Sequence, residues 1–479
     1  MPAWARSKAW LAALALGAGA ALRLWFIAAY PEVEGDPLLY GDIAKNWMLH
    51  GLYGLNAGAH IQPTLIRLPG YPLFLILCFR LFGVENYNAV MLFQAAIDLG
   101  TCLLIAALAR RLWSPRAGWW ALWLAVLCPF TANFVATPLT ETLELFCIAL
   151  AFYAFDRFLA APRWPWALTL AAAWSYATLL RPDGALLALA LCPALVVYGA
   201  RRWGAAPMIR WALACGLLSI LPFIPWTLRN ARTFHLFQPL APRYAVDPGE
   251  SSDPGFQRWT KTVCVDLACT WDIYWAANND AIDLADLPSR AFDSPRQFIA
   301  TRNLIDDYNR VTTITPRIDA RFAALAAQRI RAHPFRYYVL LPLARLADMT
   351  LRPRTEMLWI ELRWWQYGRH NAETDFALGY AALNLAYLIA AFIGFLKRPR
   401  LSGVILAFVL LRCALLLTLE APEPRYTLEF FPLLIVLAAV AFSHRERNAE
   451  RCDRRSTRPP DPASTPSPGS ARSKSAAAG

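Results

Sequence analysis

The segment EGDPLLYGDIAKNWMLHGLYGLNAGAHIQPTLIRLPGYP, residues 34–72, is polar and rich in Gly and Pro, and it follows the first hydrophobic run of the chain directly. Two of its acidic residues, Asp36 and Asp42, lie close behind that run. A carboxylate at the end of a membrane helix costs free energy unless water solvates it or a partner in a functional site pairs with it. We therefore expect this segment to form the lip of a functional site beside the membrane, with Asp36 as its central residue.

The composition of the chain is that of a membrane protein. Of its 479 residues, 57% are hydrophobic and only 17% are charged, and the mean hydropathy is +0.33. These values exclude an ordinary soluble globular protein. Much of the net charge of +13 lies in short clusters between apolar runs and in the tail, which is the distribution that the positive-inside rule predicts. We therefore expect contacts with membrane lipids and no binding of nucleic acid.

Ten apolar runs are long enough to cross a membrane as helices. They are residues 9–30, 88–109, 117–136, 143–160, 164–180, 185–200, 208–226, 376–396, 402–419 and 428–443. The first run outlasts the apolar core of a signal peptide and predicts a retained anchor helix. Basic turns alternate with turns that contain few Lys or Arg, and the basic ones mark the cytoplasmic side. The sequence thus predicts an all-α polytopic membrane protein with about ten transmembrane helices and both termini in the cytoplasm.

Hydropathy divides the chain into four parts. Residues 1–230 predict an N-terminal transmembrane module that contains the polar lip, and residues 373–443 contain the last transmembrane helices. Between them, residues 231–372 are of mixed polarity and too long for a plain connector, so they predict a mixed extracytoplasmic subdomain. Inside it, ITPRIDARFAALAAQRIRAHPFRYY at 314–338 has the apolar spacing of an amphipathic helix. Residues 444–479 are rich in Arg, Ser, Pro and Ala and predict a disordered cytoplasmic tail.

The cysteines predict neither a metal site nor a disulfide framework. Most of them fall in or beside apolar runs, where Cys is an ordinary small hydrophobe. Cys264 and Cys269 share the 231–372 segment, and the sequence leaves open whether they form a local disulfide or remain two free thiols. No histidines have the His-x-x-x-His spacing of a metal-binding helix. No cofactor is therefore predicted, although a divalent cation is compatible with carboxylates at the site.

Polar residues of the expected outer face gather near helix ends. They include Asp36, Tyr40, Asp42, Arg67, Glu141, Arg181, Arg229, Arg425 and Tyr426. An arginine fork binds phosphate bidentately and stabilises the charge on a leaving phosphate. A carboxylate removes the proton of an attacking hydroxyl or amine, or holds a divalent cation. Together these groups suit a transfer reaction whose donor is a lipid phosphate with its tail in the bilayer.

Seven short motifs follow one another along the membrane part of the chain. They are Asp-x3-Tyr-x2-Ile-Ala-x-Asn at 36–46, HGLYG at 50–54, PTLIRLPGYPLF at 63–74, PLTETLELF at 138–146, LLRPDG at 179–184, PWTLRN at 225–230 and EPRYTLEFFP at 423–432. In this order they resemble the membrane glycosyltransferases of the GT-C fold, in particular the bacterial relatives of protein O-mannosyltransferases and of aminoarabinose transferases. Gly35 and Pro37 flank Asp36, so the Asp-Glu pair of those branches is absent and the sugar and acceptor stay open.

The resemblance implies a glycosyltransferase in the bacterial inner (plasma) membrane. It would move a sugar from a polyprenyl-phosphate donor to a lipid, glycan or protein acceptor at the periplasmic face, with inversion at the sugar carbon. Asp36 would be the catalytic base or electrostatic anchor, and Glu141 the second acidic position. The substrate-binding residues that we predict beside them are Tyr40, Asp42, Arg67, Arg181, Arg229, Arg425 and Tyr426.

Structural roles are open for the same residues. Asp36 with Pro37 fits the cap of an interfacial helix, and Glu141 fits the first turn of the next helix. Asp42 would then lie on an exposed helix face, and the arginines fit as snorkelling interface anchors. The alternative function is a lipid-linked sugar transporter or flippase. Such proteins place charges at mid-membrane and often have repeated halves, whereas this chain gathers its charges at one face.

Overall fold

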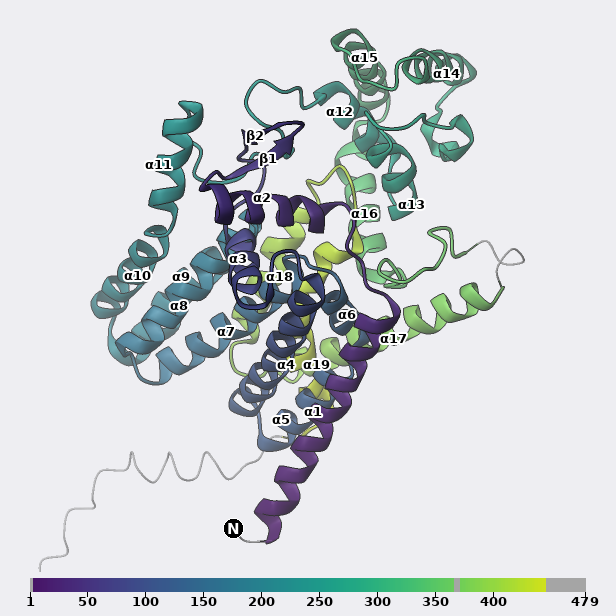
Figure 1. Cartoon of the computed structure of the whole chain (residues 1–479). Helices are drawn as coiled ribbons and strands as arrows, with labels where there is room; N and C mark the ends of the chain where they lie inside the picture. Colours follow the sequence, from purple (N-terminus) through teal and green to yellow (C-terminus); the bar gives the residue numbers. More distant parts are fainter. Residues whose placement is uncertain (1–2, 366–370, 445–479) are drawn as a thin grey trace, which may run out of the picture. The chain divides into compact units, whose positions relative to one another are not determined.

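The computed structural model describes residues 3–365 and 371–444. Within them the chain is helical apart from one antiparallel hairpin (Figure 1). The predicted all-α membrane fold is thereby confirmed. In this part of the chain, five helices are long and apolar enough to cross a membrane, or seven if each of two bent helix pairs makes one crossing. The figure of about ten crossings therefore stays a prediction.

Most helices of the first half lie close to the predicted apolar runs, although residues 70–82 form a helix outside them and the helix at 223–234 extends beyond the run 208–226. They are α1 (Ala3–Ala29), α3 (Gly70–Phe82), α4 (Tyr87–Leu112), α5 (Pro115–Val126), α6 (Pro129–Ala132), η1 (Asn133–Ala136), α7 (Glu141–Ala160), α8 (Trp164–Leu180), η2 (Pro182–Gly184), α9 (Ala185–Trp203), α10 (Ala205–Ile220) and α11 (Phe223–Phe234). Two predicted runs are broken, by 50° between α5 and α6–η1 and by 41° between α10 and α11. Pro129 and Pro222 stand at these breaks, because proline cannot donate the hydrogen bond that continues a helix.

The polar lip is more regular than the loop that the sequence predicts. It folds into α2 (Asp36–His50) and the hairpin of β1 (Gly54–Ala57) and β2 (His60–Pro63). Pro37 stands in the first turn of α2, where its missing N–H costs nothing. Gly51 ends the helix with a φ of 70°, a conformation that glycine adopts without strain. Figure 1 shows α2 running across the long helices rather than along them.

The segment after α11 is also helical, with a hydrophobic core of its own. Its elements are α12 (Pro254–Val263), α13 (Leu267–Cys269), η3 (Thr270–Trp275), η4 (Leu284–Asp286), η5 (Ser289–Ala291), α14 (Pro295–Asn309), α15 (Pro316–Ala332), η6 (Arg336–Leu340) and α16 (Leu341–Leu351). The core includes Trp259 of α12 and Phe322 of α15, whose rings lie 4.8 Å apart. The amphipathic helix that we predicted here is α15. Cys264 and Cys269 form a disulfide, which settles the alternative left open by the sequence.

The last helices close the membrane part. They are α17 (Asn371–Leu396), α18 (Ser402–Leu416), η7 (Pro424–Phe430) and α19 (Phe431–Ala441). α19 packs against α17, α5 and α4, and it is buried along almost its whole length. The division into four parts drawn from hydropathy remains a prediction. The tail expected at 444–479 lies outside the described residues from position 445 onward.

A buried ion pair ties three of these helices together. Arg23 of α1 and Asp98 of α4 approach to 2.5 Å, with side chains 0% and 2% exposed. Nη1 of the same arginine donates to the carbonyls of Gly19 and of Val126 in α5, both at 2.8 Å. A charge inside an apolar bundle is tolerated where it is paired and hydrogen-bonded. Arg23, which interrupts the first apolar run, is therefore a structural residue.

Candidate active site

A cavity of about 680 Å³ opens where the lip meets the helix bundle. Eight charged side chains line it, among them Asp183, Arg243 and Glu420 and five that come from different parts of the chain: Asp36, Arg67, Glu141, Arg181 and Arg425. These last five are among the residues predicted from the sequence. Tyr40 and Tyr426, also predicted, line the same cavity.

Helix ends deliver most of these side chains. Asp36 is the first residue of α2, and Glu141 is the first residue of α7. Both carboxylates therefore lie at the N-terminal end of a helix, a common position for acidic side chains. Arg181 follows the last residue of α8 in an extended conformation, and Pro182 after it disfavours continuation of the helix. Arg425 comes from η7. The two helix-start roles that the sequence left open are thus compatible with a place in the cavity.

Asp36 is held between two arginines. Its Oδ1 accepts a hydrogen bond from Arg67 Nη2 at 2.7 Å, and its Oδ2 lies 3.7 Å from Arg425 Nη2. Burial alone would raise the pKa of the carboxyl, but the positive charges of Arg67 and Arg425 outweigh burial and hold the pKa below its ordinary value. The Asp36 carboxylate is consequently ionised at neutral pH.

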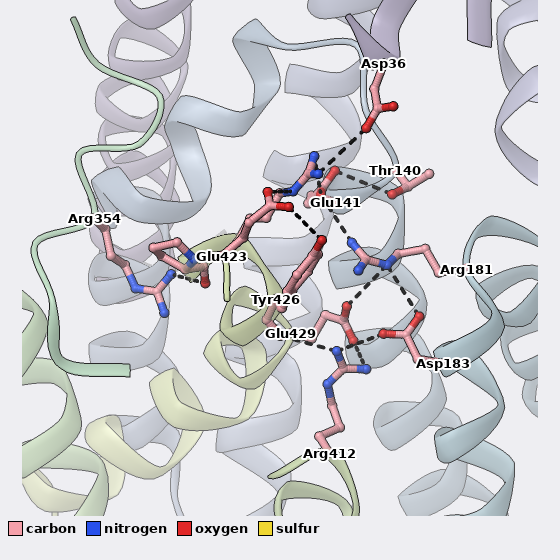
Figure 2. Close-up of polar contacts among 12 residues, drawn as sticks. Asp36, Thr140, Glu141, Arg181, Asp183, Arg354, Arg412, Glu423, Tyr426 and Glu429 are labelled. Atoms are coloured by element: carbon pink, nitrogen blue, oxygen red, sulfur yellow. Dashed lines mark hydrogen bonds and ion pairs between the residues drawn. The ribbon is translucent and has the colours of Figure 1, made fainter. Parts of the chain in front are cut away.

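Glu141 joins the same network from the other side of the cavity. Its Oε1 lies 3.2 Å from Arg181 Nη1 and 3.9 Å from Arg425 Nη1. Arg425 also pairs through Nε with Glu423 at 2.6 Å. Figure 2 shows Asp36, Glu141, Arg181 and Glu423 approaching one another from separate elements. The guanidinium of Arg425 thus lies among three carboxylates, so it joins α2, α7 and η7 through one charge.

Two aromatic rings lie under the arginines. The Arg181 and Arg425 guanidiniums lie 5.2 Å and 5.5 Å from the ring centroid of Tyr426, and Arg67 lies 5.7 Å from that of Tyr40. The Tyr426 hydroxyl donates to Glu423 at 2.8 Å. A ring face below a guanidinium fixes its plane and leaves its N–H edge free to donate. The rings and the neighbouring carboxylates together therefore fix the orientation of these three guanidiniums at the cavity.

Three further charged residues continue this network and are absent from the predicted site: Asp183 lines the cavity, whereas Arg412 and Glu429 do not. Arg412 of α18 pairs with Asp183 at 3.1 Å and with Glu429. Arg181 connects these residues to the rest of the network, because it lies 3.4 Å from Asp183 and 3.8 Å from Glu429. The signal for Arg412 was present in the sequence, since a lone arginine inside the apolar run 402–419 demands a partner. Asp183 and Glu429 could not be chosen as that partner without the packing of the helices.

Asp42 and Arg229, two predicted substrate-binding residues, do not line the cavity. Asp42 accepts hydrogen bonds from the backbone and side chain of Asn56, which joins α2 to the hairpin. Arg229 donates to the carbonyls of Thr64 at 2.7 Å and Tyr53 at 2.5 Å. Both residues therefore stabilise the fold of the lip through contacts outside the cavity.

Part of the cavity wall comes from the segment after α11. Tyr244, Tyr274 and Trp275 line the cavity there. Glu420 anchors this wall, because it pairs with Arg243 at 2.7 Å and with Lys261 at 3.4 Å. Within residues 3–365 and 371–444, no three His, Cys, Asp or Glu side chains are grouped so as to hold a metal ion.

The family model of dolichyl-phosphate-mannose-protein mannosyltransferases matches residues 63–226. The match supports the resemblance inferred from the motifs, and the matched segment contains Arg67, Glu141 and Arg181. It ends before Arg425 and begins after Asp36, so those two residues rest on the motifs and on the geometry of the cavity.

Solved structures of low similarity extend over most of the chain. ArnT from Cupriavidus metallidurans matches in its apo state with 15% identity and a TM-score of 0.41, covering 91% of this chain and 78% of that one. The same protein bound to undecaprenyl phosphate matches with 16% identity and a TM-score of 0.41 over the same shares. Archaeal oligosaccharyltransferase AglB from Archaeoglobus fulgidus, in complex with an inhibitory peptide and a dolichol-phosphate, matches with 13% identity and a TM-score of 0.46, over 91% of this chain and 50% of that one. No curated protein sequence matches the chain significantly.

Proposed function

We propose that this protein is an integral-membrane glycosyltransferase that transfers a sugar from a polyprenyl-phosphate donor to a lipid, glycan or protein acceptor. The observation that carries the proposal is the arrangement of Asp36 and Glu141 with Arg67, Arg181 and Arg425 around one cavity. We further propose that the cavity opens at the periplasmic face of a bacterial inner membrane, where a polyprenyl phosphate reaches it from the bilayer.

The arginines have a role on the donor side. Arg181 and Arg425 lie over the ring of Tyr426 with N–H groups that can turn to a phosphate. A bidentate guanidinium matches two phosphate oxygens and is worth most where charge grows on the leaving group. In the proposed reaction the bond between the sugar carbon and the phosphate oxygen breaks. Its electrons leave on the phosphate, which departs as polyprenyl phosphate beside these two arginines.

The carboxylates have a role on the acceptor side. The acceptor hydroxyl or amine attacks the sugar carbon, and its proton passes to the ionised Asp36. One direct displacement inverts the configuration of that carbon. Glu141 holds Arg181 and Arg425 in place at 3.2 Å and 3.9 Å, and the aromatic wall of Tyr244 and Trp275 bounds the space left for the acceptor. A divalent cation would be compatible with these carboxylates, but no step above depends on one.

The test uses the full chain in proteoliposomes. The donors are a panel of undecaprenyl-phosphate-linked hexoses and pentoses, and the acceptors are envelope lipids and glycans from cells that lack the protein. Released undecaprenyl phosphate and glycosylated product are measured together by mass spectrometry. The Asp36→Asn variant should lose about 10²- to 10⁴-fold in turnover, the usual contribution of a general base.

Asp42→Asn is the matched control, because Asp42 lies on the same helix and contacts Asn56 outside the cavity. It should keep turnover close to that of the parent protein. Near-normal turnover by Asp36→Asn would remove Asp36 from the mechanism. Movement of the donor across the vesicle membrane without any covalent product would replace the transferase with a flippase.

A further inference from the structure

A second cavity, of about 320 Å³, lies at the other end of the α7–α8 hairpin. At one end of this hairpin, α7 begins with Glu141 and α8 is followed by Arg181, both in the candidate active site. A helix of 20 residues such as α7 is about 30 Å long, so the two cavities are well separated. The second cavity is lined by Arg111, Arg157, Ala160, Ala161, Arg163 and Trp166.

The charges around this cavity do not balance. Asp156 is fully buried beside it, and its Oδ1 accepts from Arg400 Nη2 at 3.0 Å while its Oδ2 accepts from Arg111 Nε. Both carboxylate oxygens are thus occupied by two arginines. Arg157 and Arg163 form no ion pair with any carboxylate among residues 3–365 and 371–444. Asp156 therefore pairs with Arg111 and Arg400, and Arg157 and Arg163 have no carboxylate partner in the described part of the chain.

The geometry leaves donors free at the cavity. The Arg157 guanidinium lies 4.6 Å from the ring centroid of Trp166, an arrangement that fixes the plane of the group and exposes its N–H edge. α8 begins at Trp164 directly after Arg163, without a side-chain cap on its first turn. The positive end of the α8 dipole meets the negative end of α7, whose last residue Ala160 also lines the cavity, so the positive charge here comes from the arginines. A helix start beside arginines is a favourable place for phosphate.

The positive-inside rule accounts for arginines in this turn but not for their arrangement. That rule concerns the number of basic residues near the ends of transmembrane helices. It is satisfied equally well by Arg201 and Arg202 at the end of α9, which line neither described cavity. Convergence of three guanidiniums on one hollow, with the neighbouring carboxylate already occupied, is a feature of an anion site. Basic pockets between membrane helices bind lipid head groups in this way.

We propose that the cavity formed by Arg111, Arg157, Arg163 and Trp166 binds a phosphate-bearing anion. The phosphate accepts hydrogen bonds from the Arg157 and Arg163 guanidiniums, and Trp166 packs against whatever the phosphate carries. Either the head group of an anionic membrane lipid or a soluble phosphate supplies this chemistry. The site does not depend on the proposed transferase reaction, since it shares no residue with the cavity around Asp36.

The experiment measures binding to the full chain, delipidated in a neutral detergent. The probes are phosphatidylglycerol, zwitterionic phosphatidylcholine and inorganic phosphate, with chloride at equal ionic strength as the reference. Native mass spectrometry counts bound lipid, and a thermal unfolding titration follows phosphate. The variant is the pair Arg157→Gln and Arg163→Gln. The matched control is Arg201→Gln with Arg202→Gln, which removes the same charge from a neighbouring turn.

We expect the parent protein to bind one of the anionic probes saturably, and the Arg157/Arg163 pair to lower its affinity at least tenfold. The control pair should stay within about twofold of the parent, because its arginines lie outside the cavity. Binding of phosphatidylglycerol alone identifies the lipid, and binding of inorganic phosphate identifies a soluble ligand. Equal losses in both variants, or no saturable binding to the parent, would overturn the site. If the double variant does not fold, Arg163→Gln alone, at an exposed position, provides the same comparison.

Discussion

Two arginine–aspartate pairs of this molecule have the same chemistry but different surroundings. Arg23 and Asp98 are 0% and 2% exposed, and the arginine also donates to two backbone carbonyls. Arg67 and Asp36 are 20% and 33% exposed and face the large cavity. The first pair has its donors and acceptors occupied by the protein itself. The second shares its charges with further arginines and carboxylates at the cavity, so its partners can exchange when a ligand arrives.

The comparison teaches how to separate a structural ion pair from a candidate site in a membrane protein. Exposure is one difference, since the first pair is 0% and 2% exposed and the second 20% and 33%. The clearer difference is whether the charged groups of a pair contact only each other and uncharged groups, or also contact further charged side chains. The bundle pair is closed by α1, α4 and α5, whereas the cavity pair belongs to an open network that continues through Arg425 to Glu141 and Glu423.

The largest expected effect on folding comes from the closed pair. Asp98→Ala leaves the Arg23 guanidinium buried without its counter-charge, which should destabilise the protein by about 3–5 kcal/mol. Asp36→Ala should change stability by about 1 kcal/mol or less, because Arg425 retains Glu141 and Glu423 and the Arg67 side chain is 20% exposed to solvent. Thermal unfolding and recovery of monodisperse protein in detergent measure both.

The control for this prediction removes both charges. Arg23→Leu with Asp98→Leu leaves no unpaired ion, and such replacements are often neutral or stabilising. The double variant should therefore recover most of the stability that Asp98→Ala loses. If Asp36→Ala unfolds the protein as severely as Asp98→Ala, the distinction between a closed and an open pair is wrong.

The next effect concerns binding at the open network. Arg425→Gln removes a guanidinium that faces Asp36 at 3.7 Å and Glu141 at 3.9 Å. We expect affinity for undecaprenyl phosphate to fall about 10- to 100-fold, the range for one lost charged hydrogen-bonding group. Arg229→Gln is the comparison, since its guanidinium binds backbone carbonyls outside the cavity. Equal losses of ligand affinity in the two folded variants would show that Arg425 has no special place in the site.

The sequence predicted this architecture unevenly, for physical reasons. α7 and α8 begin and end within two residues of the predicted runs, because a long apolar run with Pro or Arg at its limits leaves the backbone few alternatives. The same polarity rule assigned Asp42 and Arg229 to the outer face. The rule could not predict that these two residues lie outside the large cavity, because residues on the same face of a membrane need not line the same cavity. The Arg412–Asp183–Glu429 cluster depends on contacts between distant helices, which a single sequence does not specify.

A smaller effect, on pH dependence, sharpens the comparison at Asp36 itself. Burial raises the pKa of this carboxyl and the charges of Arg67 and Arg425 lower it by more. In the parent protein the carboxylate is therefore ionised throughout pH 5–8, and Asp36 should cause no acid loss of kcat/KM there. Its contribution to stability has the same sign: it is present above the unfolded pKa of about 4 and is lost as pH falls through the lower folded pKa.

Arg67→Gln removes the nearer positive charge and its hydrogen bond at 2.7 Å. With less positive charge nearby to counter the effect of burial, the pKa of Asp36 rises. The acid limb of the kcat/KM profile therefore moves to higher pH. The pH–rate profile of the variant measures the shift, and Arg67→Lys, which keeps the charge, should show less of it. A shift toward lower pH, or an unchanged limb that Asp36→Asn also leaves in place, would mean that Asp36 does not take the proton.

The smallest effect belongs to Asp42, on the same helix as Asp36. Its carboxylate accepts from the Asn56 backbone at 2.7 Å and lies 3.7 Å from Lys45, both at the partly exposed surface of the lip. Asp42→Asn keeps one acceptor for the hairpin and removes a weak surface ion pair, so it should cost less than about 1 kcal/mol. Hydrogen exchange of the β1–β2 amides should report a modest local loosening with the charged network of the large cavity unchanged. A loss of turnover comparable to that of Asp36→Asn would instead show that the hairpin controls the cavity, and the two aspartates of α2 would then act as one unit.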